Sequence, residues 1–140
     1  CQNEATCGKL YNWYAVETGK LCPTDWHLPT DEEWTVLTNY LAANGHSGKE
    51  GTALKATSFW SDTDLGAANG IDAFGWSGLP YGRRLSEWPG FVDPVFGFWW
   101  SSSETSANGA WYRRLDYDGD SVYSNISNKK AGFSVRCLRD

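Results

Sequence analysis

Methionine is absent from the 140 residues, and histidine and proline are scarce, with two and five residues respectively. The longest apolar stretch, Phe96 to Trp100, is far too short to cross a bilayer, which excludes a membrane-spanning segment. Basic residues number 12 against 17 acidic ones, so the formal charge is -5. Such a chain would repel a phosphate backbone rather than neutralise it, and the composition therefore argues against a DNA or RNA partner.

The sequence shows no start methionine, signal peptide or membrane anchor, so we expect a domain trimmed from a longer protein. Its 15.6 kDa suit a single domain, residues 1–140, with a core of its own. Nine tryptophans, seven tyrosines and six phenylalanines are available to fill that core and to form recognition surfaces.

The four cysteines do not have the spacing of a zinc site, because the sequence has no CxxC motif and few histidines. An even number without metal spacing indicates disulfides and an extracellular or cell-surface location. Three pairings are possible, and we favour Cys1–Cys7 as a local clip together with Cys22–Cys137. Four reduced, buried thiols are the alternative.

One helix is well marked. Thr30-Asp31-Glu32-Glu33 has the pattern of a capping box, with Thr30 as the N-cap and Glu33 reaching back to it. Apolar residues at helical spacing then predict one buried stripe, formed by Trp34, Leu37, Tyr40 and Leu41. Asn44-Gly45 is expected to end the helix. The acidic residues at its start are therefore interpreted as capping groups that complement the helix dipole, and not as a catalytic pair.

The other segments predict several strands and one more helix. Aromatic and β-branched residues predict a strand at 10–16, and a short helix is expected at 51–57 with Leu54 facing inward. Residues 58–96 are irregular and rich in Gly, Pro, Asp and Ser, which is typical of functional or self-packed loops. Strands are predicted at 97–102, 110–115 and 132–138, with a surface turn at 124–130. The class is therefore α+β.

Four segments together resemble a known family. They are Leu10–Val16, Leu21–Trp34, Phe98–Glu104 and Gly132–Asp140. Their order and spacing resemble the Fibrobacter succinogenes major paralogous domain over essentially the whole chain. That family is related to the formylglycine-generating-enzyme branch of the C-type lectin fold. Its members usually carry a further N-terminal strand before the position of Cys1.

The resemblance implies a C-type-lectin-like fold on a secreted or surface protein of bacteria, with a small twisted antiparallel sheet, two helices and long loops. It supports the pairing Cys22–Cys137, because both cysteines fall in family motifs, and the clip between Cys1 and Cys7. It also implies that several tryptophans are scaffold, namely Trp26, Trp34, Trp99 and Trp100.

The enzymatic chemistry of the related proteins is not expected here. Formylglycine-generating enzymes use two active-site cysteines and copper, in the segment that corresponds to residues 110–116. This segment contains no cysteine, and copper(I) and thiol redox chemistry need thiolate ligands. His27 and His46 lie in no recognisable nucleophile motif. We therefore expect neither catalysis nor a resident metal.

Residues 112–128 have the Tyr, Ser, Gly and Asn content of antibody-type binding surfaces. Because Leu115 is expected to face inward, strand alternation predicts that Tyr112 and Arg114 face outward. An ordinary polar hairpin is the alternative. The predicted ligand-binding residues are Tyr112, Arg114, Asp116, Tyr117, Asp118, Asp120, Tyr123, Asn125 and Asn128, and the predicted partner is a protein or glycan on another surface.

The same segment suggests a diversity-generating retroelement, since C-type lectin folds of the implied kind host such elements. They mutate adenines near the 3′ end of a gene, and randomised Asn codons never yield Gln, Lys, Glu, Met or Trp. Residues 112–128 contain none of these amino acids. The hypothesis is a variable, surface-displayed receptor.

Two further features remain open. Asp116, Asp118 and Asp120 could bind calcium through oxygen ligands, although a solvated acidic turn is the interpretation we favour. Trp88, Phe91 and Phe96, close to two arginines, could flank a sugar or peptide pocket or simply pin the loop, and we favour pinning. A fixed carbohydrate-binding or adhesion module is the alternative function.

Overall fold

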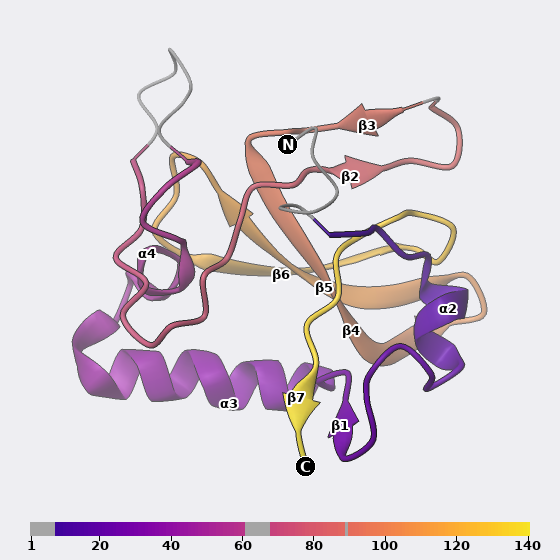
Figure 1. Ribbon diagram of the computed structural model, residues 1–140, viewed down its shortest axis with the longest axis horizontal. Helices are drawn as coiled ribbons and strands as arrows, with labels where there is room; N and C mark the ends of the chain where they lie inside the picture. The colour runs from indigo at the N-terminus through magenta and orange to yellow at the C-terminus, as the bar shows by residue number, and fades with distance from the viewer. Residues whose placement is uncertain (1–7, 61–67, 89) are drawn as a thin grey trace.

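The computed structural model describes residues 8–60, 68–88 and 90–140. Its centre is a three-stranded antiparallel sheet in the order β4–β5–β6, formed by β4 (Phe96–Ser106), β5 (Gly109–Asp116) and β6 (Val122–Asn128). Helix α3 (Asp31–Leu41) runs along one side of this sheet (Figure 1). The short helix α2 (Trp13–Glu17) lies beside one end of its strands. The chain is therefore α+β, as predicted.

The capping box at the start of α3 is confirmed. The Thr30 hydroxyl accepts the Glu33 N–H, and the Glu33 carboxylate accepts the Thr30 N–H at 2.8 Å. Trp34 and Leu41 are buried as predicted, whereas Tyr40 is exposed and packs edge-on against Phe74. The helix continues as a π-turn, η1 (Ala42–His46), and Gly45 ends it at a φ of 91°. The second predicted helix is the shorter α4 (Glu50–Leu54), with Leu54 buried.

The predicted strand at residues 10–16 is wrong, because most of that segment forms α2. The Asn12 side chain accepts the Ala15 N–H at 3.0 Å and so caps this five-residue helix. Only Tyr11 makes a β-bridge, exchanging backbone hydrogen bonds of 2.8 and 3.0 Å with Phe133. The aromatic content that suggests a strand instead places Trp13 in the core.

Both faces of the central sheet are covered. On one face lies the α2-side core, which includes Trp13, Phe98, Trp100, Tyr112 and Phe133. On the other lies the α3-side core, which includes Trp34, Leu54, Trp60, Trp99 and Leu115. Alternate residues of β4 and β5 point into opposite cores, so β5 is buried along almost its whole length.

Two predictions for the end of the chain need correction. The segment expected as a surface turn at 124–130 is mostly the strand β6, which pairs with β5 from Val122 to Asn128. The strand expected at 132–138 is instead a series of isolated bridges followed by β7 (Leu138–Arg139), which pairs with β1 (Trp26–His27).

The disulfide Cys22–Cys137 is present, with the two Cα atoms 5.7 Å apart. It joins segments separated by 115 positions and so ties the region before α3 to the end of the chain. The predicted clip Cys1–Cys7 lies outside the described residues. Trp34, Trp99 and Trp100 are scaffold as expected, whereas Trp26 is exposed.

Among the residues that the structure describes, no helix has the length and apolar character needed to cross a membrane.

Candidate ligand-binding surface

A short hairpin projects from the sheet and is fixed at its base. Its strands are β2 (Arg83–Arg84) and β3 (Phe91–Val92). The Arg83 guanidinium donates to the Asp93 carboxylate at 2.5 Å and lies 5.0 Å from the centre of the Phe98 ring. Gly82 donates its N–H to the Phe96 carbonyl at 2.8 Å. These contacts hold the start of the hairpin against the first residues of β4.

The hairpin is also joined to the last part of the chain. Arg84 and Gly132 exchange two backbone hydrogen bonds, of 2.9 and 2.7 Å. A Cβ atom on Gly132 would lie 3.2 Å from the Cβ of Arg84, closer than most real Cβ contacts. Glycine therefore suits this position, because Arg84 and Leu10 pack closely against its backbone.

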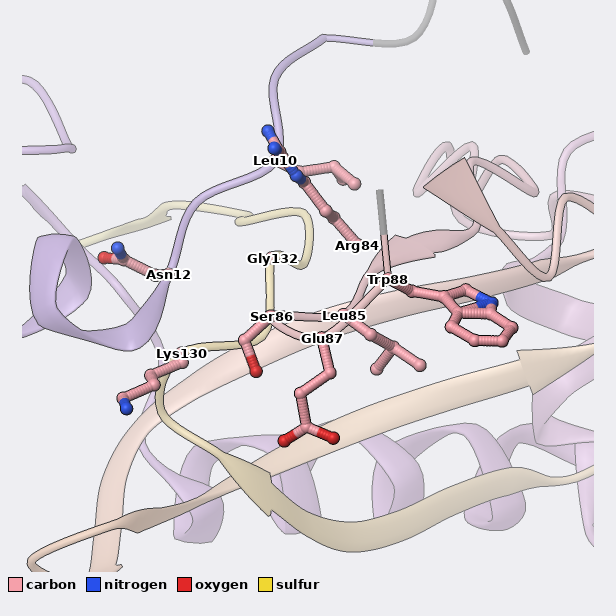
Figure 2. Close-up of a pocket in the computed structure, with 9 residues that line it drawn as sticks. All are labelled: Leu10, Asn12, Arg84, Leu85, Ser86, Glu87, Trp88, Lys130 and Gly132. Carbon is pink, nitrogen blue, oxygen red and sulfur yellow. The ribbon is translucent and has the colours of Figure 1, made fainter. Parts of the chain in front are cut away.

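A cleft of about 570 Å³ opens where these segments meet, and we call it the hairpin cleft. Figure 2 shows Asn12 and Lys130 on one side and the segment from Arg84 to Trp88 on the other. Trp88 is 61% exposed, so its indole ring is not used to fill the core. The lining residues are Leu10, Asn12, Arg84, Leu85, Ser86, Glu87, Trp88, Lys130 and Gly132.

Charged groups in the hairpin cleft are free to meet a ligand. Arg84, Glu87 and Lys130 are all exposed, and within the described part of the chain none of them has an ion-pair partner. Other cations of the protein are paired, since Arg83, Arg113, Arg114 and Lys129 each form an ion pair with a carboxylate. The cleft thus holds polar groups without internal partners.

The interpretation of Trp88 and Phe91 as rings that pin the loop is wrong. Both are exposed, at 61% and 72% respectively. Only Phe96 has the expected packing role, with its ring against Phe98 and Tyr117. Asn12 and Lys130 were not expected at any site, because nothing in their own segments shows that the chain brings them to Arg84.

The surface predicted at residues 112–128 is divided by the fold. Tyr112 is only 5% exposed and packs in the α2-side core against Phe133, so its prediction as a surface residue is wrong. Asp116 is 8% exposed and receives two hydrogen bonds from Arg114, at 2.6 and 2.9 Å. The prediction assumed that one face of the strand meets solvent, whereas β5 is the middle strand with a core on each face.

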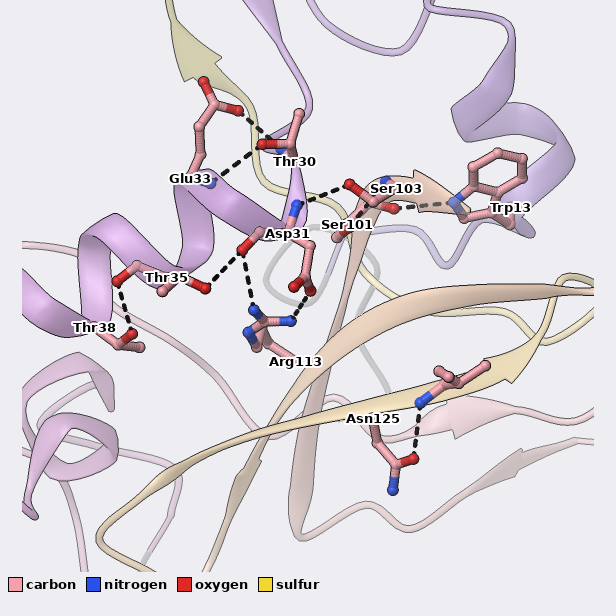
Figure 3. Close-up of polar contacts among 11 residues, drawn as sticks. Trp13, Thr30, Asp31, Glu33, Thr35, Thr38, Ser101, Ser103, Arg113 and Asn125 are labelled. Atoms are coloured by element: carbon pink, nitrogen blue, oxygen red, sulfur yellow. Dashed lines mark hydrogen bonds and ion pairs between the residues drawn. The ribbon is translucent and has the colours of Figure 1, made fainter. Parts of the chain in front are cut away.

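Arg113 joins two elements inside the protein. Its guanidinium donates to the Asp31 carboxylate at 2.5 Å and to the Asp31 carbonyl at 3.2 Å (Figure 3). The side chain is buried, and its guanidinium also lies 6.0 Å from the centre of the Trp34 ring. Arg113 therefore joins β5 to the first turn of α3.

The remaining predicted residues, apart from Arg114 on β5, lie on β6 and the turn before it. Asp118, Asp120, Tyr123, Asn125 and Asn128 are exposed, and we call them the β6 surface. Tyr117 is half-buried, and Arg114 is half-buried between the rings of Phe96 and Tyr123.

Two asparagine side chains of the β6 surface accept hydrogen bonds from backbone N–H groups of nearby residues. The Asn125 carboxamide accepts the Ile126 N–H at 2.8 Å (Figure 3), and Asn128 accepts the Lys130 N–H at 2.9 Å.

The acidic turn before β6 already faces a cation from the protein itself. The Lys55 ammonium reaches this turn from the end of α4 and donates to the Gly119 carbonyl. Asp120 accepts from the Thr52 hydroxyl at 2.5 Å. Across the described residues, no cluster of His, Cys, Asp and Glu side chains is arranged to hold a metal ion.

The two histidines occupy different environments. His27 lies between the Asp140 carboxylate, at 2.5 Å from Nδ1, and the Glu33 carboxylate, at 2.9 Å from Nε2. The hydrogen bond with Asp140, followed by that with Glu33, raises the pKa of His27 above 6.5. His46 packs its ring edge-on against Phe74.

Comparison with protein families matches residues 1–139 to the Fibrobacter succinogenes major domain. No curated protein matches the chain, and no solved structure does.

Proposed function

The chain belongs to the Fibrobacter succinogenes major domain family, and from this premise we propose a non-catalytic module that binds a saccharide chain through the hairpin cleft. We further propose a C-type-lectin-like fold and display on a secreted or surface protein, in line with the sequence resemblance and the Cys22–Cys137 disulfide. Of the two binding hypotheses raised by the sequence, the fixed carbohydrate module has the better geometric support.

The observation that carries this proposal is the exposed Trp88 on a cleft that also holds polar side chains without internal partners. An indole presents a flat apolar face, and the C–H face of a sugar ring can stack on it. Ser86 and Glu87 can exchange hydrogen bonds with sugar hydroxyls, and the Asn12 amide NH2 group can donate to them while its oxygen caps α2. A concave site with one large ring and a few convergent polar groups is the usual form of a small-ligand site.

The cleft supports binding rather than hydrolysis. Glycosidases of the common mechanisms need two carboxyl groups about 5–9.5 Å apart, one acting as acid and the other as base or nucleophile. Among the described residues that line the hairpin cleft, Glu87 is the single carboxylate. Its partners there are cations and neutral groups, so the proposal has no catalytic step.

The β6 surface supports a second candidate, a receptor diversified by a retroelement. Its exposed residues are adjacent along one strand and the preceding turn. Tyr112, Arg113 and Leu115 have buried roles that random replacement would destroy, so diversification would be confined to residues 117–128. Sequencing of this gene across the source population tests the idea, since the receptor requires substitutions at adenine sites within those codons.

The hairpin cleft is tested by a glycan array followed by affinity measurements with Trp88→Ala. We expect the variant to lose at least tenfold in affinity while its Tm changes little, because the ring is exposed. Trp26→Ala is the matched control, since it removes an exposed tryptophan at the far end of the molecule. Undiminished binding by Trp88→Ala would overturn the proposal.

A further inference from the structure

We propose that the saccharide is acidic, with a carboxylate on its sugar units, and that Arg84 is the residue that recognises that carboxylate. This inference rests on the proposed function, because it names the ligand class of the same hairpin cleft.

The backbone register places Arg84 in the middle of a row of three residues. Arg84 pairs with Phe91 across the hairpin and with Gly132 on its other side. Residues paired directly across antiparallel strands have side chains on the same face. Arg84 is therefore flanked by the exposed Phe91 on one side and by Gly132, which carries no side chain, on the other.

The charge of the hairpin cleft differs from that of the whole chain. The chain carries a formal charge of -5, whereas the cleft residues that the structure describes include two cations, Arg84 and Lys130, and one carboxylate, Glu87. A guanidinium donates two parallel hydrogen bonds to a carboxylate, and the planar match favours arginine over lysine for this recognition. Two cations without ion-pair partners on the same cleft of an acidic protein therefore point to an anionic ligand.

The aromatic rings distinguish a sugar polymer from a small anion. Trp88 and Phe91 are both exposed on the same hairpin, Trp88 in its loop and Phe91 on β3. Two such rings offer stacking faces to successive units of a chain, while a free carboxylate or phosphate would use neither. Single-stranded nucleic acid also combines stacking with negative charge, but the net charge of the chain opposes it, so it becomes an outcome of the test.

Substitution of Glu87 is expected to change the affinity for an acidic chain in the opposite direction to substitution of Arg84. Its carboxylate lines the same cleft and repels a ligand carboxylate, so Glu87→Gln is expected to strengthen binding of an acidic chain. A neutral saccharide gains nothing from that substitution and loses an acceptor for its hydroxyls. The two variants Arg84→Gln and Glu87→Gln therefore shift affinity for an acidic chain in opposite directions.

The experiment compares polygalacturonate with its methyl ester, which has the same backbone without the charge, by affinity electrophoresis and calorimetry. We expect the acid form to bind about tenfold more tightly than the ester, and Arg84→Gln to remove most of that ratio. Glu87→Gln should raise affinity for the acid form severalfold. Arg139→Gln, which removes an exposed cation from β7 at the opposite end of the molecule, is the matched control.

The outcomes separate the inference from the proposed function. Equal affinity for acid and ester, with Trp88→Ala still abolishing both, overturns the acidic class and leaves saccharide binding intact. Binding of neutral glycans but not of acidic ones likewise overturns the acidic class and leaves saccharide binding intact. Competition by single-stranded DNA at equal or higher affinity also overturns the acidic saccharide. A protein that binds no saccharide on the array fails at the proposed function itself.

Discussion

The ammonium group of Lys55 donates a hydrogen bond of 2.7 Å to the carbonyl oxygen of Gly119, in the turn that joins β5 to β6. A second carbonyl, that of Tyr117, lies 3.5 Å away. The lysine is only 3% exposed, and burial lowers its pKa, while three nearby aspartates oppose that change. The turn whose carboxylates suggested a calcium site thus has a cation supplied by the chain.

Replacement of Lys55 by Met tests this role. The two carbonyls lose their donor and the aspartates lose their counter-charge, so we expect a loss of about 2–4 kcal/mol in the free energy of unfolding. Lys20→Met, at an exposed position, should change it by less than about 0.5 kcal/mol. Thermal unfolding of the wild-type chain should be the same with calcium and with a chelator. A calcium-dependent rise in its Tm would contradict the assignment.

His27 predicts a pH dependence of stability. Its pKa is raised in the folded state, so the protonated form stabilises the fold. This contribution is complete below 6.5 and is lost as the pH rises through the folded pKa. His27→Gln should therefore be destabilised relative to wild type at acidic pH and match it at alkaline pH. An NMR titration that places the His27 pKa at or below 6.5 would disprove the argument.

Glu33 predicts the opposite pH dependence of stability. The hydrogen bond from the Thr30 N–H lowers its pKa below 4.5 despite partial desolvation. Its contribution is present above 4.5 and is lost as the pH falls through the folded pKa. Glu33→Gln should therefore have a lower Tm than wild type at neutral pH and the same Tm near pH 3, so that its Tm falls less steeply with acidification. An unchanged acid limb would show that the cap carries no charge-dependent stability.

Tyr112 and Tyr123 should respond very differently to truncation. Tyr112 is packed among Phe98, Trp100 and Phe133, and Tyr112→Ala is expected to cost about 3–5 kcal/mol in urea denaturation. Tyr123 is 41% exposed, and its loss should cost less than about 1 kcal/mol. Equal costs for the two substitutions would mean that β5 is not the buried central strand.

The Cys22–Cys137 disulfide should stabilise the chain by about 2–5 kcal/mol, because it closes a long loop in the unfolded state. The double substitution to Ala should lower the urea midpoint by a corresponding amount. Hydrogen exchange should accelerate first at β1 and β7, which pair through only two residues each and lie next to the bridge. Unchanged exchange at β7 would show that pairing alone holds the end of the chain.

Features that depend on a few neighbouring residues could be predicted from the sequence. The capping box at Thr30 and Glu33 needs only four positions, and the structure has both of its hydrogen bonds. At Asn12 the same kind of local signal was masked by a run of aromatic residues that is typical of strands. The carboxamide cap and the burial of Trp13 decide in favour of a helix there.

Features that depend on distant pairing could not be predicted. Val122–Asn128 is rich in Ser and Asn, which favour turns, but pairing with β5 satisfies its backbone and makes it a strand. Strand alternation assigned Tyr112 to a solvent face that does not exist, since it cannot reveal whether one or both faces of a sheet are covered. The hairpin cleft could not be predicted for the same reason, because its parts are brought together by long-range bridges such as Arg84–Gly132 and Tyr11–Phe133.

The β2–β3 hairpin has two parts: a frame, formed by its two strands, and a tip, formed by residues 85–88. The frame is fixed by the Arg83–Asp93 ion pair and by backbone hydrogen bonds to Gly132, none of which involves residues 85–88. The tip can therefore change its side chains over generations without unfolding the domain, and related modules could acquire new ligands by substitution there. In a laboratory library, randomising the tip while keeping the frame should yield mostly folded variants with altered binding preferences.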